Sequence, residues 1–244
     1  MIKIEALYTE ACNLYGDRFN VTYLEKSLQG QAEFIYTSLN ETPRFVTEDV
    51  DMIYMGAMPE KEQEYVIDRL RPYTDRLRQL IDAGKVMLFT GNAFEVFGSY
   101  IEKDDGSRIP CLGLYEGYAV RRMMQRHNSM FLGTLTDDTG KDMEIIGFKS
   151  QFTQTYADKA EGYCFRKIRG YGLNKAFDQE GIRMGNFFGT YLTGPILIMN
   201  PYFAKYLLRL AGAGDVTLAF EEVAVAAYEK RLPEFHDPKR KVDL

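Results

Sequence analysis

Histidine and cysteine are scarce in this sequence. Only two histidines, His127 and His236, occur among 244 residues, so few side chains of this kind are available for proton transfer near neutral pH. Both lie in polar surroundings and are expected at the surface. The three cysteines, Cys12, Cys111 and Cys164, are far apart, odd in number and without CxxC spacing. This pattern argues against a disulfide framework or a zinc site and indicates reduced thiols in a cytoplasmic protein.

Long apolar runs and basic stripes are also missing. No window approaches the run of about 18 apolar residues that a membrane span needs, and the early acidic and polar residues do not fit a secretory signal. The formal net charge of −5 argues against nucleic acid as a partner. The basic stretch Asp237–Lys241 is expected to be a solvated terminus. Nothing in the sequence indicates a metal or another cofactor.

The first hundred residues contain an alternation of strand and helix patterns. Short apolar runs of strand character occur at Ile2–Tyr8, Phe34–Ser38, Asp51–Met55 and Lys85–Phe89. Helical patterns occur at Asp17–Leu28, from Pro59 to Gly84 with an interruption at Pro72, and at Gly91–Ile101. This alternation predicts a parallel sheet with helices on both faces.

After Gly106 the pattern changes to short runs separated by turn residues. Strands of antiparallel hairpins are expected at Tyr118–Met124, Ser129–Leu135, Met143–Phe148, Tyr163–Ile168 and Ile182–Phe187. Two closing helices are expected at Pro201–Leu210, with Asn200 as N-cap, and at Leu218–Glu229. No linker or repeat interrupts the chain. We therefore expect residues 1–244 to form a single α/β domain whose sheet extends into added hairpins.

Five segments, spread over most of the chain, form an ordered set of motifs. They are Asn13–Asn20 (NLYGDRFN), Met52–Gln63 (MIYMGAMPEKEQ), Val86–Gly98 (VMLFTGNAFEVFG), Gly147–Phe152 (GFKSQF), and Gly170–Gly172 and Glu180–Ile182 followed by Gly189–Leu197 (GTYLTGPIL). In order and spacing they resemble the class I glutamine amidotransferases of the cobyric acid synthase type. Within that group they are most similar to the subunits that work with a Mur-ligase-like synthetase on lipid II. The resemblance implies a three-layer, flavodoxin-like fold with a mostly parallel central sheet and an antiparallel extension.

The resemblance also implies where the chemistry of the family would lie. These enzymes hydrolyse the side-chain amide of glutamine with a cysteine thiolate and a histidine base. The family reads CGGYQ where this chain has Thr90-Gly91-Asn92, and GTYLHGPIL where it has Thr193 in place of the histidine. A threonine hydroxyl ionises several pKa units above a thiol, and a second threonine cannot act as its base near neutral pH. The sequence therefore predicts loss of glutaminase activity.

The remaining cleft positions follow from the same motifs. The family's glycine loop, which offers N–H groups to the oxyanion, is Gly56-Ala57-Met58, and its asparagine-histidine-glycine segment is Ser150-Gln151-Phe152. With Gly91 and Asn92, these residues are expected to line a cleft at the carboxyl edge of the sheet. An arginine for the substrate carboxylate is expected near Met130, and Arg126 is close in sequence.

Three functions compete at this point. The chain is a partner-binding or regulatory subunit without catalysis, with a Mur-ligase-like synthetase as the possible partner, or it binds a small amide or amino acid in the altered cleft. The third possibility is an enzyme with new chemistry in the old site. A ligand-sized pocket would favour the second function. A perturbed titratable pair in the cleft would favour the third, for which Glu95 and Lys149 are the candidates.

Overall fold

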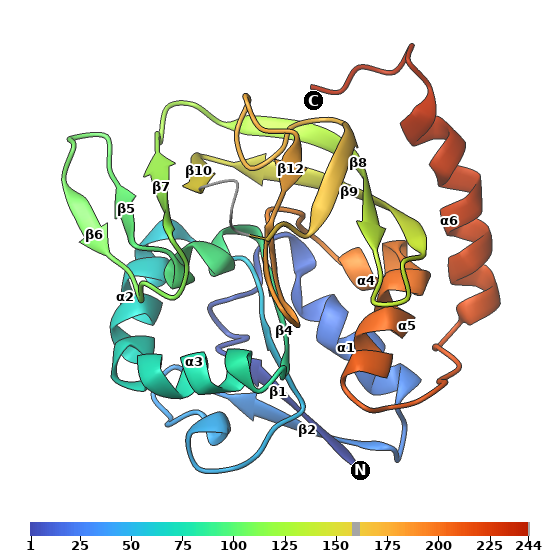
Figure 1. The fold of residues 1–244 in the computed structure, drawn as a ribbon, viewed down its shortest axis with the longest axis horizontal. Coiled ribbons are helices and arrows are strands. Elements are labelled where there is room, and N and C mark those ends of the chain that lie inside the picture. The colour runs from blue at the N-terminus through green and yellow to red at the C-terminus, as the bar shows by residue number, and fades with distance from the viewer. Residues whose placement is uncertain (158–161, 244) are drawn as a thin grey trace.

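A six-stranded sheet forms the centre of the computed structural model, which describes residues 1–157 and 162–243 (Figure 1). Its strands run in the order β13-β14-β4-β3-β1-β2. Their bounds are β1 (Ile2–Leu7), β2 (Ala32–Thr37), β3 (Met52–Met55), β4 (Val86–Thr90), β13 (Ile182–Met184) and β14 (Phe187–Thr190). All neighbouring pairs are parallel except β13 with β14. The mostly parallel sheet expected from the sequence is confirmed.

Helices cover both faces of this sheet. They are α1 (Arg18–Ser27), α2 (Glu60–Leu70), α3 (Thr74–Asp82), α4 (Ile196–Met199) and α5 (Pro201–Leu210). The last helix, α6 (Glu221–His236), packs instead against α4, α5 and β8. Because side chains alternate along a strand, Ile53 and Met87 join the apolar cluster of α2 and α3, whereas Met52 and Val86 join that of α1 and α5. This is the three-layer architecture that the sequence predicted. No helix in the described ranges is long and apolar enough to cross a membrane.

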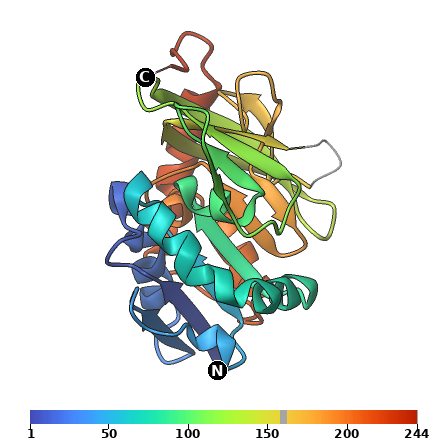
Figure 2. The ribbon, with the colours of Figure 1, turned by 90° about the vertical axis from the view of Figure 1, so that its left-hand side faces the viewer.

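Two small sheets extend the central one at the end remote from the N-terminus (Figure 2). One has the order β10-β7-β5-β6 and consists of β5 (Tyr100–Glu102), β6 (Arg108–Pro110), β7 (Gly117–Arg121) and β10 (Thr153–Ala157). The other has the order β12-β11-β8-β9 and consists of β8 (His127–Thr136), β9 (Asp142–Gln151), β11 (Phe165–Arg169) and β12 (Gln179–Glu180). Apart from the β5–β7 pair, these strands are antiparallel, as expected of the extension.

Four short 3₁₀ segments complete the fold, and one replaces a helix that the sequence predicted. They are η1 (Leu14–Gly16), η2 (Arg44–Val46), η3 (Arg71–Tyr73) and η4 (Gly91–Phe97). The helix expected at Gly91–Ile101 is present only as a 3₁₀ helix over Gly91–Phe97; its expected end is wrong, because the chain leaves η4 at Gly98 and enters β5. A Cβ at Gly98 would come within 3.0 Å of Gly117 O, so glycine allows β7 to approach here. Nearly all of η4 is buried, which removes the exposed face of an amphipathic helix.

Two other boundaries differ from the sequence prediction. The run Ile182–Phe187 is not one strand, because Gly185 adopts a φ of +59° and reverses the chain between β13 and β14. The last helix begins at Glu221 instead of Leu218 and continues to His236.

Asn200 and the C-terminal tail are bound differently from the expectation. Asn200 makes no N-cap hydrogen bond; its side chain accepts from Ile146 N at 2.9 Å and donates to Ile146 O at 2.8 Å. The side chains of the tail are largely exposed, but Arg169 donates to the carbonyl groups of Asp237 and Arg240 at 2.7 and 2.8 Å. The tail is therefore tied to the β8–β9–β11 sheet by its backbone.

Candidate functional site

Three strand ends of the central sheet meet at one buried carboxylate, that of Asp17. Because β3, β4 and β14 are adjacent and parallel, their carboxyl ends lie side by side. Oδ2 of Asp17 accepts hydrogen bonds from Thr90 Oγ1 at 2.6 Å and Ala57 N at 2.7 Å. Oδ1 accepts one from Gly194 N at 2.7 Å. Burial raises the pKa of this carboxyl to about 6, although the three hydrogen bonds lower it. Asp17 thus holds the three loops together.

Thr90, which the sequence led us to expect at the family's nucleophile position, is fully buried at the end of β4. Its backbone is extended (φ −106°, ψ 155°), and the positive φ of the turn belongs to Gly91 instead. The hydroxyl donates to Asp17 and lies 3.3 Å from Tyr54 Oη. A nucleophile at a strand-to-helix turn needs an exposed side chain. Thr90 directs its hydroxyl into the protein.

Thr193, which the sequence led us to expect at the family's base position, follows β14 and bonds to the edge of β9. Its N–H and its hydroxyl both donate to Phe148 O, at 3.0 and 3.3 Å. Its methyl carbon lies 3.5 Å from the point that a Cβ on Gly91 would occupy. The residue therefore lies beside the turn after Thr90, with its hydroxyl turned to the backbone of β9.

The N–H groups of the loop after β3 are also engaged within the protein. Ala57 N donates to Asp17, and Met58 N donates to Asn92 Oδ1 at 3.0 Å. Asn92 Nδ2 returns a hydrogen bond to Met58 O at 2.8 Å. A Cβ on Gly91 would lie 2.4 Å from that of Ala57, so the two loops are in direct contact. Neither donor points to a space where an oxyanion could form.

The space between these loops is a cavity of about 60 Å³. Its walls are Leu14, Tyr15, Ala57, Met58, Glu60, Gly91, Asn92, Arg126, Ser150, Gln151, Phe152, Thr153, Tyr191 and Thr193. Eight of the ten positions predicted from the sequence line it, while Gly56 and Thr90 lie behind the wall. A cavity of this size holds a few water molecules, well below the roughly 300 Å³ of a ligand pocket. A groove of about 820 Å³ lies elsewhere, between the β8–β9 turn and α5.

Four of the side chains that line this cavity contact one another in pairs. The Arg126 guanidinium stacks on the Phe152 ring at 4.7 Å, and Tyr15 Oη donates to Ser150 O and contacts Ser150 Oγ, each at 3.3 Å. The arginine expected near Met130 is thus represented at the cavity by Arg126. Phe152, where the family has glycine, fills space next to it.

Comparison with known proteins shows the family of this chain. Residues 3–201 match the family model of the CobB/CobQ-like glutamine amidotransferase domain. The chain belongs to this family. It is 26% identical over 204 residues to the lipid II isoglutaminyl synthase (glutamine-hydrolyzing) subunit GatD of Staphylococcus aureus, covering 83% of this chain and 81% of that protein. It is also 26% identical over 252 aligned residues to the subunit of the same name from Streptococcus pneumoniae, covering 100% and 94%.

A solved structure supports the same fold. A chain of PurLQS from Thermotoga maritima superposes with a TM-score of 0.53 at 13% identity, covering 95% of this chain and 99% of that one. At this identity the likeness concerns the amidotransferase fold alone.

In this amidotransferase-family chain, the two candidate titratable groups are not paired with each other. Glu95 is buried beneath the cavity wall, where it accepts from Tyr191 Oη at 2.7 Å and from Gln63 Nε2 at 2.9 Å. Burial raises the pKa of Glu95 to about 7, although these two hydrogen bonds lower it. Lys149 lies on the other side of Tyr191, with its Nζ 5.2 Å from the centre of that ring. Neither Glu95 nor Lys149 lines the cavity.

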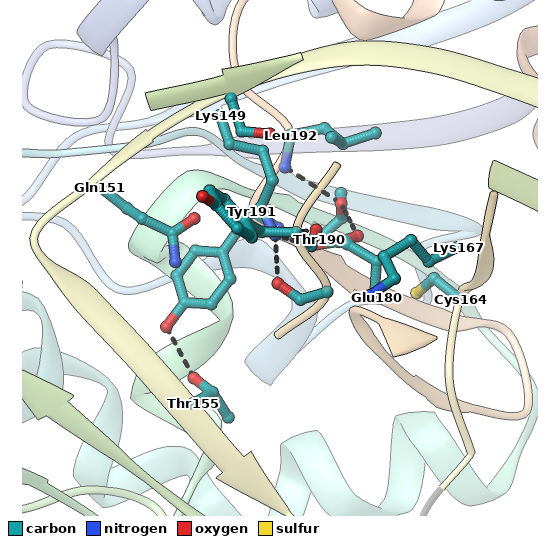
Figure 3. A network of polar contacts seen from close by, with 12 residues as sticks. Lys149, Gln151, Thr155, Cys164, Lys167, Glu180, Thr190, Tyr191 and Leu192 are labelled. Carbon is teal, nitrogen blue, oxygen red and sulfur yellow. Dashed lines mark hydrogen bonds and ion pairs between the residues drawn. The ribbon is translucent and has the colours of Figure 1, made fainter. Parts of the chain in front are cut away.

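Lys149 is instead paired with Glu180, 3.4 Å away (Figure 3). Its Nζ also donates to the carbonyl groups of Tyr171 and Gly172 at 3.1 and 2.6 Å. Glu180 accepts from the hydroxyl of Thr190 at 2.6 Å and from Tyr191 N at 2.9 Å. Burial lowers the pKa of Lys149, and Glu180 opposes that shift. The family motif GFENHGG has a glutamate where Lys149 stands, so the substitution places a cation against Glu180.

Sequence reasoning missed Asp17 and Asn20, which organise the site. Asn20 Nδ2 donates to the carbonyl groups of Asp17 and Gly194 at 3.1 and 3.2 Å, and its Oδ1 accepts from Leu197 N at 3.0 Å. Both residues belong to the motif Asn13–Asn20, so the signal was present without a role attached to it. Cys12, next to this motif, is buried, and its thiol lies 3.8 Å from Met58 Sδ. Burial raises the pKa of this thiol, which makes it unreactive.

The buried Glu95 predicts a pH dependence of stability. Its pKa is about 7 in the folded protein against an ordinary value of 4.5, so between these values the folded state retains a proton that the unfolded state loses. The free energy of unfolding should therefore fall as pH rises from 4.5 to 7, by about 3 kcal/mol from this residue. In urea unfolding across this range, the fall in stability should be smaller in Glu95→Gln than in the wild type by about 3 kcal/mol. The slope that remains in the variant comes from Asp17, whose pKa burial raises to about 6. Glu229→Gln, at an exposed site, should behave like the wild type; an unchanged slope in Glu95→Gln would contradict the assignment.

Proposed function

We propose that this chain is an amidotransferase-family subunit without glutaminase activity, which acts by binding a protein partner. The observation that carries the proposal is the fully buried Thr90, whose hydroxyl donates to Asp17 at 2.6 Å. The group that should attack glutamine thus holds loops together. Residues 1–244 would act as one domain, in keeping with the cytoplasmic location expected from the cysteines.

Three further features support the loss of hydrolysis. The Thr193 hydroxyl cannot act as a general base near neutral pH, and it donates a hydrogen bond to Phe148 O. The N–H groups of Ala57 and Met58 have internal acceptors, so they cannot stabilise an oxyanion without breaking those bonds. The site therefore lacks free N–H donors for an oxyanion as well as a nucleophile.

The cavity also weighs against the other two functions. A binding module for an amide or amino acid needs a pocket that encloses its ligand, and about 60 Å³ does not hold glutamine. An enzyme with new chemistry needs a titratable group facing a substrate. Glu95 and Lys149 are instead engaged with protein groups beneath the wall.

The partner is inferred from the relatives. Both curated relatives are named as subunits of lipid II isoglutaminyl synthase, and together with the ordered set of motifs they point to a Mur-ligase-like synthetase as the partner of this chain. In such a pair a subunit without glutaminase activity would stabilise or regulate the synthetase. The synthetase would then take ammonia from solution.

This proposal is tested by co-expression with the Mur-ligase-like protein encoded nearest to the gene. The two chains should co-purify in a fixed ratio, and the complex should form its amide product with ammonium but not with glutamine as the nitrogen source. Product formed from glutamine would contradict the loss of catalysis. Failure of the two chains to associate would contradict the proposed partner. The loss of glutaminase activity would then be tested by the glutaminase assay alone.

A further inference from the structure

The edge strands of the three sheets differ in whether their outward backbone groups are hydrogen-bonded. In the described part of the chain, five of the six edge strands have backbone groups that bond to an atom outside their sheet. The capping residues are Asn200 on β9, Asn174 on β10, Arg71 on β6, Gly162 on β13 and Leu173 on β12. Such caps prevent an edge from pairing with another chain. They leave one exception, β2.

The outer edge of β2 has unpaired backbone groups. Thr37 O accepts from Tyr8 N at 2.7 Å, so the backbone groups of Thr37 face β1. Because successive residues of a strand turn these groups to opposite sides, Ala32, Phe34 and Tyr36 present theirs away from the sheet. Among the described residues, no hydrogen bond outside the β1 ladder reaches these three N–H and C=O groups. The strand therefore offers a template for an additional strand.

We propose that β2 pairs with the β2 of a second copy of this chain, so that two central sheets join into one across a twofold axis. The strand AEFIYT is rich in β-branched and aromatic residues, which favour strand pairing. A closed twofold dimer is the commonest arrangement of identical chains. It also leaves no new edge open, because β2 is the one uncapped edge strand among the described residues of each copy.

The sequence of β2 is complementary to itself in antiparallel pairing. With the axis through Phe34, this residue exchanges hydrogen bonds with its copy, and Ala32 lies opposite Tyr36. Glu33, the only charged residue of the strand, then lies opposite Ile35 and not opposite another glutamate. Like charges are thus kept apart at the pairing positions.

The surroundings of the strand do not repel a second copy, although each chain has a net charge of −5. Lys3 pairs with Glu33 and Glu48, at 3.9 and 2.9 Å. On α1, Glu25 accepts from Tyr36 Oη at 3.1 Å, and the Arg18 guanidinium lies 5.8 Å from the centre of the same ring. Both signs of charge therefore flank the edge.

Sedimentation velocity of the purified chain tests the dimer. We expect the wild type to dimerise with a Kd on the order of micromolar, as is usual for small interfaces. Tyr36→Pro removes an outward N–H without touching the β1 ladder, and proline is tolerated on edge strands. Its dimer should be weaker by at least about tenfold. Tyr36→Val loses the same side-chain contacts but keeps the N–H, so its Kd should stay closer to that of the wild type.

Hydrogen exchange of the wild type gives a second readout that needs no variant. The amides of Phe34 and Tyr36 should exchange more slowly as protein concentration rises through the Kd, whereas exposed amides outside β2 should not change. A wild type that stays monomeric at about 100 micromolar, well above the expected Kd, would overturn the proposal. So would a dimer that keeps its affinity in Tyr36→Pro or leaves these two amides unprotected.

Discussion

Glutamine incubated with the purified chain should be hydrolysed no faster than in buffer. An intact cysteine–histidine pair and its oxyanion donors together contribute on the order of a million-fold, and because they act as a unit most of this is lost with either partner. Here Thr90 and Thr193 replace both, and Ala57 N and Met58 N are bonded internally. The measurement is glutamate and ammonia release, with and without any co-purifying synthetase.

If glutamine is hydrolysed, the variant Thr90→Ala shows whether Thr90 is responsible. Turnover that disappears in Thr90→Ala would contradict the proposal and make Thr90 a nucleophile, with Asp17 at 2.6 Å as its base. Turnover that survives Thr90→Ala would belong to another site or to a contaminant.

Restoring the two lost residues should not restore the reaction. In the double variant Thr90→Cys with Thr193→His, the thiol would lie in a fully buried site against the Asp17 carboxylate. Burial and a neighbouring negative charge both raise the pKa of a thiol. The new cysteine should therefore react with iodoacetamide far more slowly in the folded protein than in urea. Strong recovery of glutaminase activity would show that the internal bonds of the oxyanion loop matter less than the two side chains.

The sequence predicted the frame of this protein better than its site. The motifs and the strand–helix alternation predicted the parallel sheet, and Pro72 indicated the interruption between α2 and α3. These are local signals, each written in a few consecutive residues. They located Thr90 and Thr193 at the right strand ends, but they did not indicate where either hydroxyl points.

What the sequence did not predict depends on contacts between distant segments. The bond from Thr90 to Asp17 spans 73 positions, and that from Gly194 to Asp17 spans 177. Asn200 was expected as an N-cap from its place before a proline, yet it caps the backbone of β9, 54 positions away. Such bonds become visible only when the packing of the sheets is known. The extent and type of the helix predicted after β4 were inaccurate for the same reason, because the burial of η4 comes from neighbouring elements.

Asn20→Ala should destabilise the protein by about 3–5 kcal/mol, because it leaves the buried N–H of Leu197 without an acceptor and removes the hydrogen bonds to the carbonyl groups of Asp17 and Gly194. The Asn20 side chain is buried in α1 and connects the backbone of Asp17 to the turn that begins α4. For a chain of this length the loss corresponds to a fall of roughly 10 °C in Tm. Urea and thermal unfolding measure both quantities.

Thr22→Ala, on the half-buried side of the same helix, is the matched control. Its hydroxyl bonds only to Arg18 O one turn back, so the change should alter stability by less than about 1 kcal/mol. If Asn20→Ala were equally mild, the loops would be held by Asp17 alone. If it is as costly as expected, the motif Asn13–Asn20 serves in this chain to hold the carboxyl ends of the sheet closed. That role explains how the motif stays recognisable although Thr90 and Thr193 stand where the family resemblance leads us to expect cysteine and histidine.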